Sequence, residues 1–261
     1  MRLVRHFRVI SLAVFGFWFA MTSLPLGLAL AASGVQSPKI TVLELYTSQG
    51  CSSCPAADRL FQSYTKRRNM VALTFHVDYW DYLGWTDTLA KRVFSERQRA
   101  YADQRRDGDV YTPQIIVNGL KHVIGSQARQ IDGALAATSP NGGTGQVPQV
   151  PMSVSAKSGT FVIKIGTALP PKKPATVWLA LVRPKVTVKI KRGENRGKAI
   201  TYHNVVHSIS PVGMWSGPET TIRLQQDAVL HGKPMNCAVL LQVDSGPILA
   251  AAWMPPAPTR N

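Results

Sequence analysis

The stretch Ile40-Thr41-Val42-Leu43-Glu44-Leu45-Tyr46-Thr47 leads, after three more residues, into Cys51-Ser52-Ser53-Cys54-Pro55. The first part is an apolar run that is typical of a strand. The residues after Cys54 carry apolar side chains at helical spacing. The sequence therefore predicts a strand, a tight loop and a helix, with Cys51 at or just before the N-terminus of the helix.

Two cysteines separated by two residues at such a position indicate redox chemistry. The exposed N–H groups and the positive end of the helix dipole favour a negative charge there. We therefore expect a lowered pKa and a reactive thiol for Cys51. Cys54 follows one turn later, close enough to form a disulfide with Cys51, and Pro55 falls in the first turn, where its missing N–H costs little.

Length and charge limit the classes of protein that need to be considered. The chain has 261 residues, 45% of them hydrophobic, which suits one large or two ordinary domains. Its net charge of +16 raises nucleic acid as a partner. The basic residues are scattered, however, and no nucleic-acid-binding motif accompanies them, so we expect a generally basic surface and no nucleic-acid partner.

The N-terminus has the pattern of a secretory signal peptide. Arg2, Arg5 and Arg8 precede an apolar run over residues 9–32 that ends in small residues. We expect a cleaved signal peptide over residues 1–32 and a periplasmic or secreted protein, with an uncleaved membrane anchor as the alternative. No second stretch is long enough to span a bilayer, so no membrane contact is expected after cleavage.

The rest of the chain divides into two parts with different periodicity. Residues 40–137 predict the order strand, helix, strand, helix, strand, strand, helix, with Asn118-Gly119 as a hairpin turn. Residues 152–254 predict short strands separated by turn residues, which is typical of an antiparallel sandwich. The connecting segments are a linker over 33–39, a second linker over 138–151 and a disordered tail over 255–261.

The first part resembles a thioredoxin-like fold. The resemblance rests on the Cys51–Cys54 motif after the first strand, on Thr112-Pro113 before the third, and on the order of the elements. It implies a cis peptide bond before Pro113 and a substrate chain aligned in extended form on the backbone of Thr112. The expected fold class is thus an α/β thioredoxin-like domain followed by an all-β antiparallel sandwich-like domain.

The whole chain resembles more closely the DUF1223 family of secreted, thioredoxin-like bacterial proteins. That likeness is carried by the segments 44–50, 76–81, 193–197 and 202–206. The family has no assigned function. The general thioredoxin-like resemblance supplies the chemistry, and it does so only for Cys51, Cys54 and Pro113.

The function expected from these residues is that of an exported thiol–disulfide oxidoreductase. A mixed disulfide with a substrate forms at Cys51, and Cys54 resolves it. The partners are protein thiols or disulfides and a redox partner, and no cofactor is needed beyond the two cysteines. Ser52-Ser53 differs from the dipeptides of thioredoxin and of the strong periplasmic oxidants, and this dipeptide tunes the reduction potential.

Other interpretations of the cysteines stay open. The pair can be a structural disulfide that joins a loop to a helix. It can also belong to a non-catalytic protein that binds a partner or a metal such as copper, with His76 or His122 as a further ligand. Half of a zinc site is less well supported, because no second pair of ligands follows at matching spacing. Cys237 lies in an apolar run, where a lone cysteine is usually just buried.

Several polar and aromatic residues have both a functional and a plain structural interpretation. Asp78 and Asp81 are candidates for proton transfer or for loop hydrogen bonds. Trp80 and its aromatic neighbours can form a rim for a protein substrate or simply pack their loop. The segment 194–196 is either a turn or, with residues 202–204, a loop that docks near the cysteines.

Overall fold

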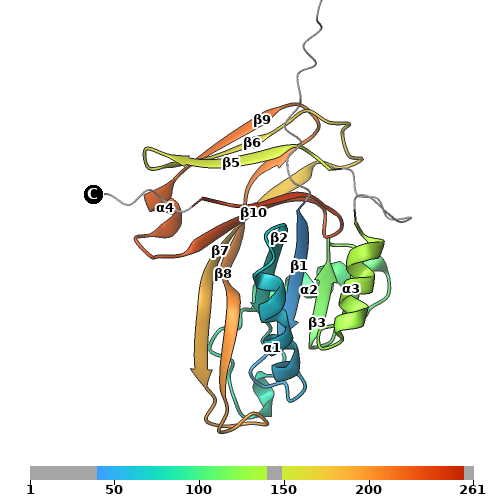
Figure 1. The fold of residues 1–261 in the computed structure, drawn as a ribbon, viewed down its shortest axis with the longest axis vertical. Coiled ribbons are helices and arrows are strands. Elements are labelled where there is room, and N and C mark those ends of the chain that lie inside the picture. Colours follow the sequence, from blue (N-terminus) through green and yellow to red (C-terminus); the bar gives the residue numbers. More distant parts are fainter. Residues whose placement is uncertain (1–39, 140–148, 256–261) are drawn as a thin grey trace, which may run out of the picture. The chain divides into compact units, whose positions relative to one another are not determined.

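A computed structural model of the protein describes residues 40–139 and 149–255 (Figure 1). The predicted signal peptide and first linker lie outside the described residues, as do most of the second linker and residues 256–261 of the tail. In the described part of the chain, no helix is long and apolar enough to cross a membrane.

A mixed sheet of eight strands forms the centre of the fold. Its spatial order is β11-β10-β7-β8-β2-β1-β3-β4. The strands are β1 (Thr41–Thr47), β2 (Met70–His76), β3 (Gln114–Val117), β4 (Lys121–Ile124), β7 (Ala175–Lys189), β8 (Ala199–Trp215), β10 (Asn236–Val243) and β11 (Ile248–Trp253). Strands β1 and β2 are parallel and joined by helix α1, whereas β3 and β4 form the hairpin expected at Asn118-Gly119.

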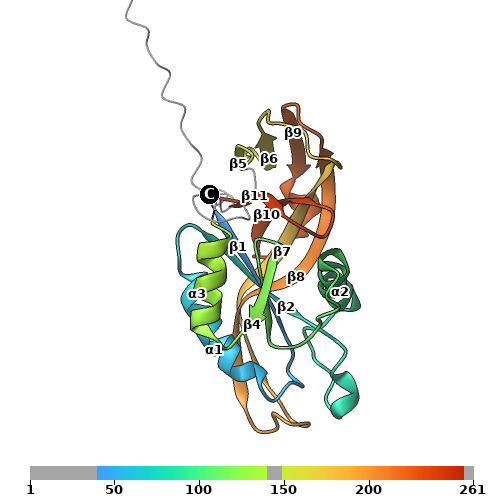
Figure 2. The same ribbon diagram turned by 90° about the vertical axis from the view of Figure 1, so that its right-hand side faces the viewer.

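Three helices cover the part of the sheet that contains β1 to β4. They are α1 (Cys54–Thr65), α2 (Arg92–Arg105) and α3 (Ala128–Ala137). In Figure 2, α1 and α3 lie on one side of the strands and α2 on the other. Alternation along β1 explains this arrangement: Leu43 and Leu45 pack with α1 and α3, while Val42 and Tyr46 pack with α2.

A smaller antiparallel sheet has the order β5-β6-β9 and packs against strands β7, β10 and β11 of the large sheet. Its strands are β5 (Met152–Lys157), β6 (Thr160–Ile165) and β9 (Thr220–Gln225), and β9 is followed by the short helix α4 (Gln226–Leu230). Phe161 and Ile163 of β6 share a core with Val177 of β7 and Val239 of β10. This part of the chain is therefore rich in strands, as its turn-rich sequence predicts.

The predicted fold class is nevertheless wrong, because a thioredoxin-like domain and a separate β-sandwich do not describe this molecule. Strands from both halves of the chain build one eight-stranded sheet. β8 pairs in parallel with β2 at Val205 and Thr74, and the Thr74 hydroxyl donates a hydrogen bond to the His203 carbonyl at 2.8 Å. Asn204 Nδ2 donates to the Ala72 carbonyl at 2.9 Å.

The physical reason for the correction is the edge of β2. A self-contained first domain would leave that edge to solvent, where unpaired N–H and C=O groups invite pairing. Here β8 meets that edge, with one backbone pair and two side-chain hydrogen bonds. The core is continuous as well, since Phe75 and Phe94 pack in the same cluster as Val206 and Leu240. Few helices and many strands make the described fold mostly β.

Candidate functional site

Cys51 and Cys54 form a disulfide bond at the start of α1. The helix begins at Cys54, with Ser53 as its N-cap residue and Pro55 in its first turn, as predicted. Cys51 lies just before the helix, and its carbonyl accepts a hydrogen bond from the Cys54 N–H at 3.3 Å. Both cysteines are buried, but Cys51 keeps 4% of its surface exposed and Cys54 keeps none, so Cys51 is the less enclosed of the two.

The proline loop lies beside the strand that leads into the disulfide. The peptide bond between Thr112 and Pro113 is cis, as the resemblance implied. The first residue of β3, Gln114, pairs with Tyr46 near the end of β1, so Pro113 is held next to the end of that strand. A Cβ atom on Gly125 would lie 3.2 Å from Pro113 Cβ and 3.3 Å from Ala57 Cβ. A glycine at this position thus lets the proline loop and the first turn of α1 approach each other.

Trp80 connects the proline loop with the cysteine loop. Its Nε1 donates a hydrogen bond to Thr112 Oγ1 at 2.7 Å. A Cβ atom on Gly50 would lie 3.1 Å from Trp80 Cβ, which places the half-buried Trp80 against the residue before Cys51. Tyr82 stacks on Trp80 with 77% of its surface exposed. The structure therefore places Trp80, one of the predicted substrate-contact residues, beside the loop that carries Cys51, and joins the other, Thr112, to it by a hydrogen bond.

Asn195 anchors the cysteine loop from the second half of the chain. This fully buried side chain donates Nδ2 hydrogen bonds to the carbonyls of Gln49 at 2.9 Å and Cys51 at 2.8 Å. Gly193 in the same turn comes so close to Trp85 that a Cβ atom on Gly193 would lie 3.1 Å from Trp85 Cβ. Of the loop over 194–196 that was expected to dock near the cysteines together with residues 202–204, Asn195 makes this contact.

Asp87 holds the cysteine loop from another direction. Its Oδ2 accepts a hydrogen bond from the Gln49 N–H at 2.8 Å and lies 2.8 Å from His76 Nδ1. Burial opposes the charge on Asp87, but neighbouring His76 and the N–H groups of Gln49 and Leu89 outweigh it and lower the pKa of the carboxyl. Trp85 Nε1 donates to Gln49 Oε1 at 2.8 Å. Backbone and side chain of Gln49 are thus both fixed.

A second group of buried polar side chains lies along α1 and behind the disulfide. Asp58 is one helical turn after Cys54, and its Oδ1 accepts a hydrogen bond from Thr47 Oγ1 at 2.8 Å. Asp58 Oδ2, His76 Nε2 and the Tyr202 hydroxyl are buried without a hydrogen-bond partner in the part of the chain that the structure describes. The rings of His76 and Tyr202 are 4.4 Å apart. Burial raises the pKa of Asp58 to about 7.

The sequence reasoning missed Asp58, although a signal was there. Asp58 stands in the helical stripe of Cys54, Ala57 and Phe61, all of which are buried. A carboxyl group in such a stripe is rarely without a role or a partner. His76 was considered as a metal ligand, but in the structure its Nδ1 faces Asp87.

The other candidates have ordinary contacts. Asp78 and Asp81 hydrogen-bond within their own region, to Ser95 and to the Asp87 N–H, so the structural interpretation fits them. His122 pairs with the Tyr111 hydroxyl at 2.9 Å. It also lies near Asp107 and Asp109 in an arrangement that could hold a cation, but both carboxylates are exposed and Arg105 already pairs with Asp107.

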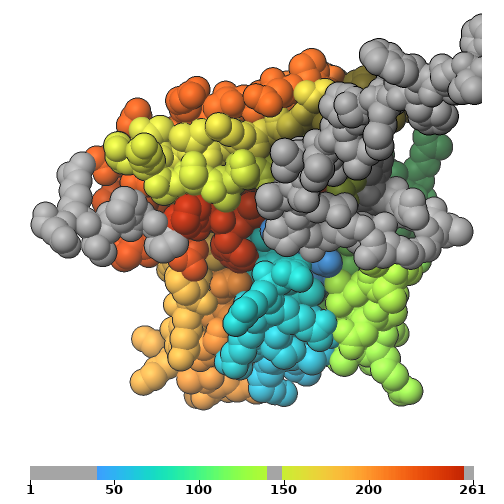
Figure 3. Space-filling view, turned by 45° about the horizontal axis from the view of Figure 1, so that its top comes forward, coloured from blue at the N-terminus to red at the C-terminus, as the bar shows by residue number. Residues whose placement is uncertain are grey.

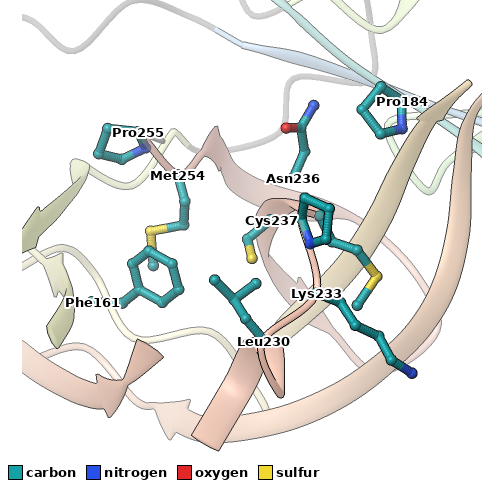
Figure 4. Close-up of a pocket in the computed structure, with 10 residues that line it drawn as sticks. Phe161, Pro184, Leu230, Lys233, Asn236, Cys237, Met254 and Pro255 are labelled. Atoms are coloured by element: carbon teal, nitrogen blue, oxygen red, sulfur yellow. The ribbon is translucent and has the colours of Figure 1, made fainter. Parts of the chain in front are cut away.

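Cys237 lines a different cavity, which has a volume of about 350 Å³ (Figure 4). Figure 4 shows it among Phe161, Leu230 and Met254. It has no disulfide partner and is buried, and burial raises the pKa of its thiol to about 11. The thiol therefore stays protonated near neutral pH, as expected for a cysteine that is simply part of the core.

Together the fold and the site define a mostly β protein with a disulfide at a helix N-terminus, bordered by a cis-proline loop. The chain belongs to the family described as "Protein of unknown function (DUF1223)", whose sequence profile matches residues 42–242. The suspected family is thereby confirmed. A search of curated proteins found no match.

Two solved structures resemble this one. Protein AGR_C_4864 from Agrobacterium tumefaciens, known from an X-ray crystal structure, is 36% identical in sequence and has a TM-score of 0.74. That match covers 87% of this chain and 98% of the other. HBP35 of Porphyromonas gingivalis is 14% identical with a TM-score of 0.55, over 86% of this chain and 79% of the other, and this likeness concerns the fold alone.

Proposed function

We propose that the protein is an exported thiol–disulfide oxidoreductase that acts on protein thiols or disulfides through Cys51 and Cys54. The observation that carries the proposal is the disulfide at the start of α1, held beside the loop of Thr112 and Pro113. The positive end of the helix stabilises a thiolate there. Export is inferred from the signal-peptide pattern of residues 1–32.

Accessibility assigns different roles to the two sulfur atoms. Cys51 is the less buried cysteine and precedes the helix, so we assign it as the point of attack. A substrate thiolate attacks Cys51 Sγ, the Cys51–Cys54 bond breaks, and the electron pair stays on Cys54 Sγ. A second substrate thiolate then attacks the substrate sulfur of the mixed disulfide and releases Cys51. The substrate is oxidised to a disulfide by two electrons, and the pair is reduced to two thiols; the reverse sequence reduces a substrate.

Asp58 is placed to handle the proton of Cys54. The two residues are four apart on the same helix, which puts their side chains next to each other on one face. Both are buried, so water is a poor proton source for Cys54. With a pKa of about 7, Asp58 can give a proton to the Cys54 thiolate or accept one from its thiol near neutral pH.

Trapping of mixed disulfides tests the proposal. Cys54→Ser leaves a Cys51 thiol with no resolving partner, so mixed disulfides should accumulate when the variant attacks model proteins that contain a disulfide. The double variant Cys51→Ser, Cys54→Ser should accumulate none, and Cys237→Ser should behave like the wild type because Cys237 is buried. If the Cys54→Ser variant traps no more substrate than the double variant, the pair is structural.

A further inference from the structure

A groove lies next to the first turn of α1, where Pro55 follows Cys54. It lies between α1 and the first residues of β8 and has a volume of about 470 Å³. Figure 3 shows the atoms of α1 directly beside those of the β7–β8 hairpin. Pro55, Arg59 and Gln62 line the groove from α1. Thr201 and His203 line it from β8, and Lys198 lines it from the turn just before β8. Because Pro55 follows Cys54, a chain bound at Cys51 can continue into the groove.

The rim of this groove is positively charged. Arg59 and Lys198 are exposed on opposite sides of it. Burial and the nearby charges of Lys185 and Lys66 lower the pKa of His203. The turn that leads into β8 adds exposed cations, and Glu194 is the single acidic residue between positions 185 and 203. Such a surface attracts negatively charged ligands.

A carboxyl group lies among these cations. Asp58 lines the groove as well, but it is 4% exposed and one of its oxygens is already hydrogen-bonded to Thr47. With a pKa of about 7 it is only partly charged near neutral pH. It therefore offsets the surrounding cations only in part.

The β8 side of the groove also offers backbone groups. β8 pairs with β7 from Ala199 to Trp215, but its pairing with β2 is confined to Val205. Between Ala199 and Tyr202 the second edge of β8 has no strand beside it among the described residues. An unpaired edge can bind an extended peptide through main-chain hydrogen bonds.

The groove is linked to the cysteine loop by a chain of hydrogen bonds. Lys198 Nζ donates to Asn195 Oδ1 at 2.8 Å, and Asn195 Nδ2 donates to the Cys51 carbonyl at 2.8 Å. The rim of the groove is thus connected through Asn195 to the loop that carries Cys51. A ligand in the groove would be positioned relative to Cys51.

We propose that the groove between α1 and β8 binds an extended, acidic segment of the substrate protein whose cysteine exchanges with Cys51. This inference rests on the proposed oxidoreductase function and adds the substrate class to it. Cationic side chains recognise the acidic residues, and the free edge of β8 recognises the extended main chain.

Two pairs of peptides separate recognition from exchange. The first pair carries one cysteine next to either four Glu or four Gln residues, and the second pair carries serine in place of the cysteine. Each cysteine peptide is first converted to a mixed disulfide with a small thiol. The reduced protein then attacks this disulfide, and exchange is measured as the rate constant for its reduction. Binding of the serine peptides to the oxidised protein is measured by fluorescence anisotropy.

The expected result is a preference for the acidic peptides, about tenfold at low ionic strength, that shrinks as salt is added. The variant Arg59→Glu reverses an exposed charge that lines the groove and should strongly reduce the preference for the acidic peptides. Lys121→Glu is the matched control, because this exposed lysine lies on β4, at the far edge of the sheet from β8.

The outcomes distinguish the two proposals. Equal binding of the Glu and Gln serine peptides, or an equal effect of Lys121→Glu, would overturn the groove. Exchange with neither cysteine peptide would overturn the oxidoreductase function, and the anisotropy result would still decide whether acidic chains bind. An oligonucleotide of equal charge that binds more tightly than the acidic peptide would overturn the choice of a peptide ligand.

Discussion

Asn195 Nδ2 donates a hydrogen bond to the carbonyl of Cys51 at 2.8 Å, across 144 positions of sequence. The same nitrogen also donates to the Gln49 carbonyl. The loop of the disulfide is therefore held by a side chain from the second half of the chain. This contact explains why the site cannot be understood from the first half alone.

Asn195→Ala should lower the stability and loosen the disulfide. The carbonyls of Gln49 and Cys51 each lose one hydrogen bond, which costs about 2 kcal/mol of unfolding free energy. Cys51 should become more exposed, so reduction by dithiothreitol should be faster. Urea unfolding and reduction kinetics measure both effects, with Arg196→Ala as a control because Arg196 is exposed in the same turn. If Asn195→Ala and Arg196→Ala have the same unfolding free energy and the same rate of reduction, the hydrogen bonds of Asn195 do not hold the cysteine loop.

Asp58→Asn should change how stability depends on pH. The folded pKa of about 7 lies above the value of about 3.9 in an unfolded chain, so the folded state binds more protons between these two pH values. Stability should therefore fall as the pH rises from about 4 to 7, by up to about 4 kcal/mol from this group.

The variant has no titratable group at position 58, so the fall in stability between about pH 4 and 7 that is due to Asp58 should vanish. The measurement is the unfolding free energy of both proteins from pH 4 to 8. The difference between wild type and variant removes the contributions of other groups. Parallel curves would mean that the Asp58 carboxyl titrates normally.

Breaking the buried ion pair of Glu44 and Arg97 should strongly destabilise the fold. Arg97 Nη2 lies 2.7 Å from Glu44 Oε1, with side-chain exposures of 9% and 1%, and it also donates to Gln242 Oε1 on β10 at 2.9 Å. Arg97→Met leaves a buried carboxylate unpaired, and we expect a loss of about 3–5 kcal/mol in thermal or urea unfolding. The exposed Arg99 on the same helix gives the control Arg99→Met.

The double variant Glu44→Leu, Arg97→Met completes this test. It removes both charges and should recover part of the loss, because no unpaired charge is left in the core. If the loss in the double variant equals the sum of the losses measured for Glu44→Leu and Arg97→Met alone, the two charges do not act as a coupled pair.

Gly119→Ala should be more harmful than Gly159→Ala. Both glycines have a positive φ, of 71° and 75° respectively, which costs alanine about 1 kcal/mol. At Gly119 a Cβ atom would also lie 2.0 Å from the Gly246 carbonyl oxygen, whereas at Gly159 it would meet nothing within 4 Å. We expect the first loss to be at least twice the second in urea unfolding. Equal losses would contradict the close packing of the β3–β4 turn against the β10–β11 turn.

Local features of this fold could be predicted because they depend on neighbouring residues. The helix after Cys54, the turn at Asn118 and Gly119, and most strands follow from spacing and turn chemistry. The arrangement of the sheet could not be predicted in the same way. Pairing of β2 with β8 joins residues 131 positions apart, Thr74 and Val205, and an apolar strand is compatible with either a free or a covered edge.

The candidate site shows the same limit. Cys51, Cys54 and Pro113 were recognised from their motif. Gln49 and Asp87 were not, because their roles come from contacts that only the folded chain creates. Asp58 is different, since a carboxyl in the apolar stripe of α1 was visible in the sequence.

The most direct test of the proposed function is the redox equilibrium of Cys51 and Cys54 in the native protein. The protein is equilibrated with mixtures of reduced and oxidised glutathione, free thiols are alkylated, and the modified peptides are identified by mass spectrometry. We predict that both thiols form together, with a reduction potential between about −120 and about −270 mV. A pair that stays oxidised in fully reduced glutathione while the protein remains folded would contradict the proposal and leave a structural disulfide.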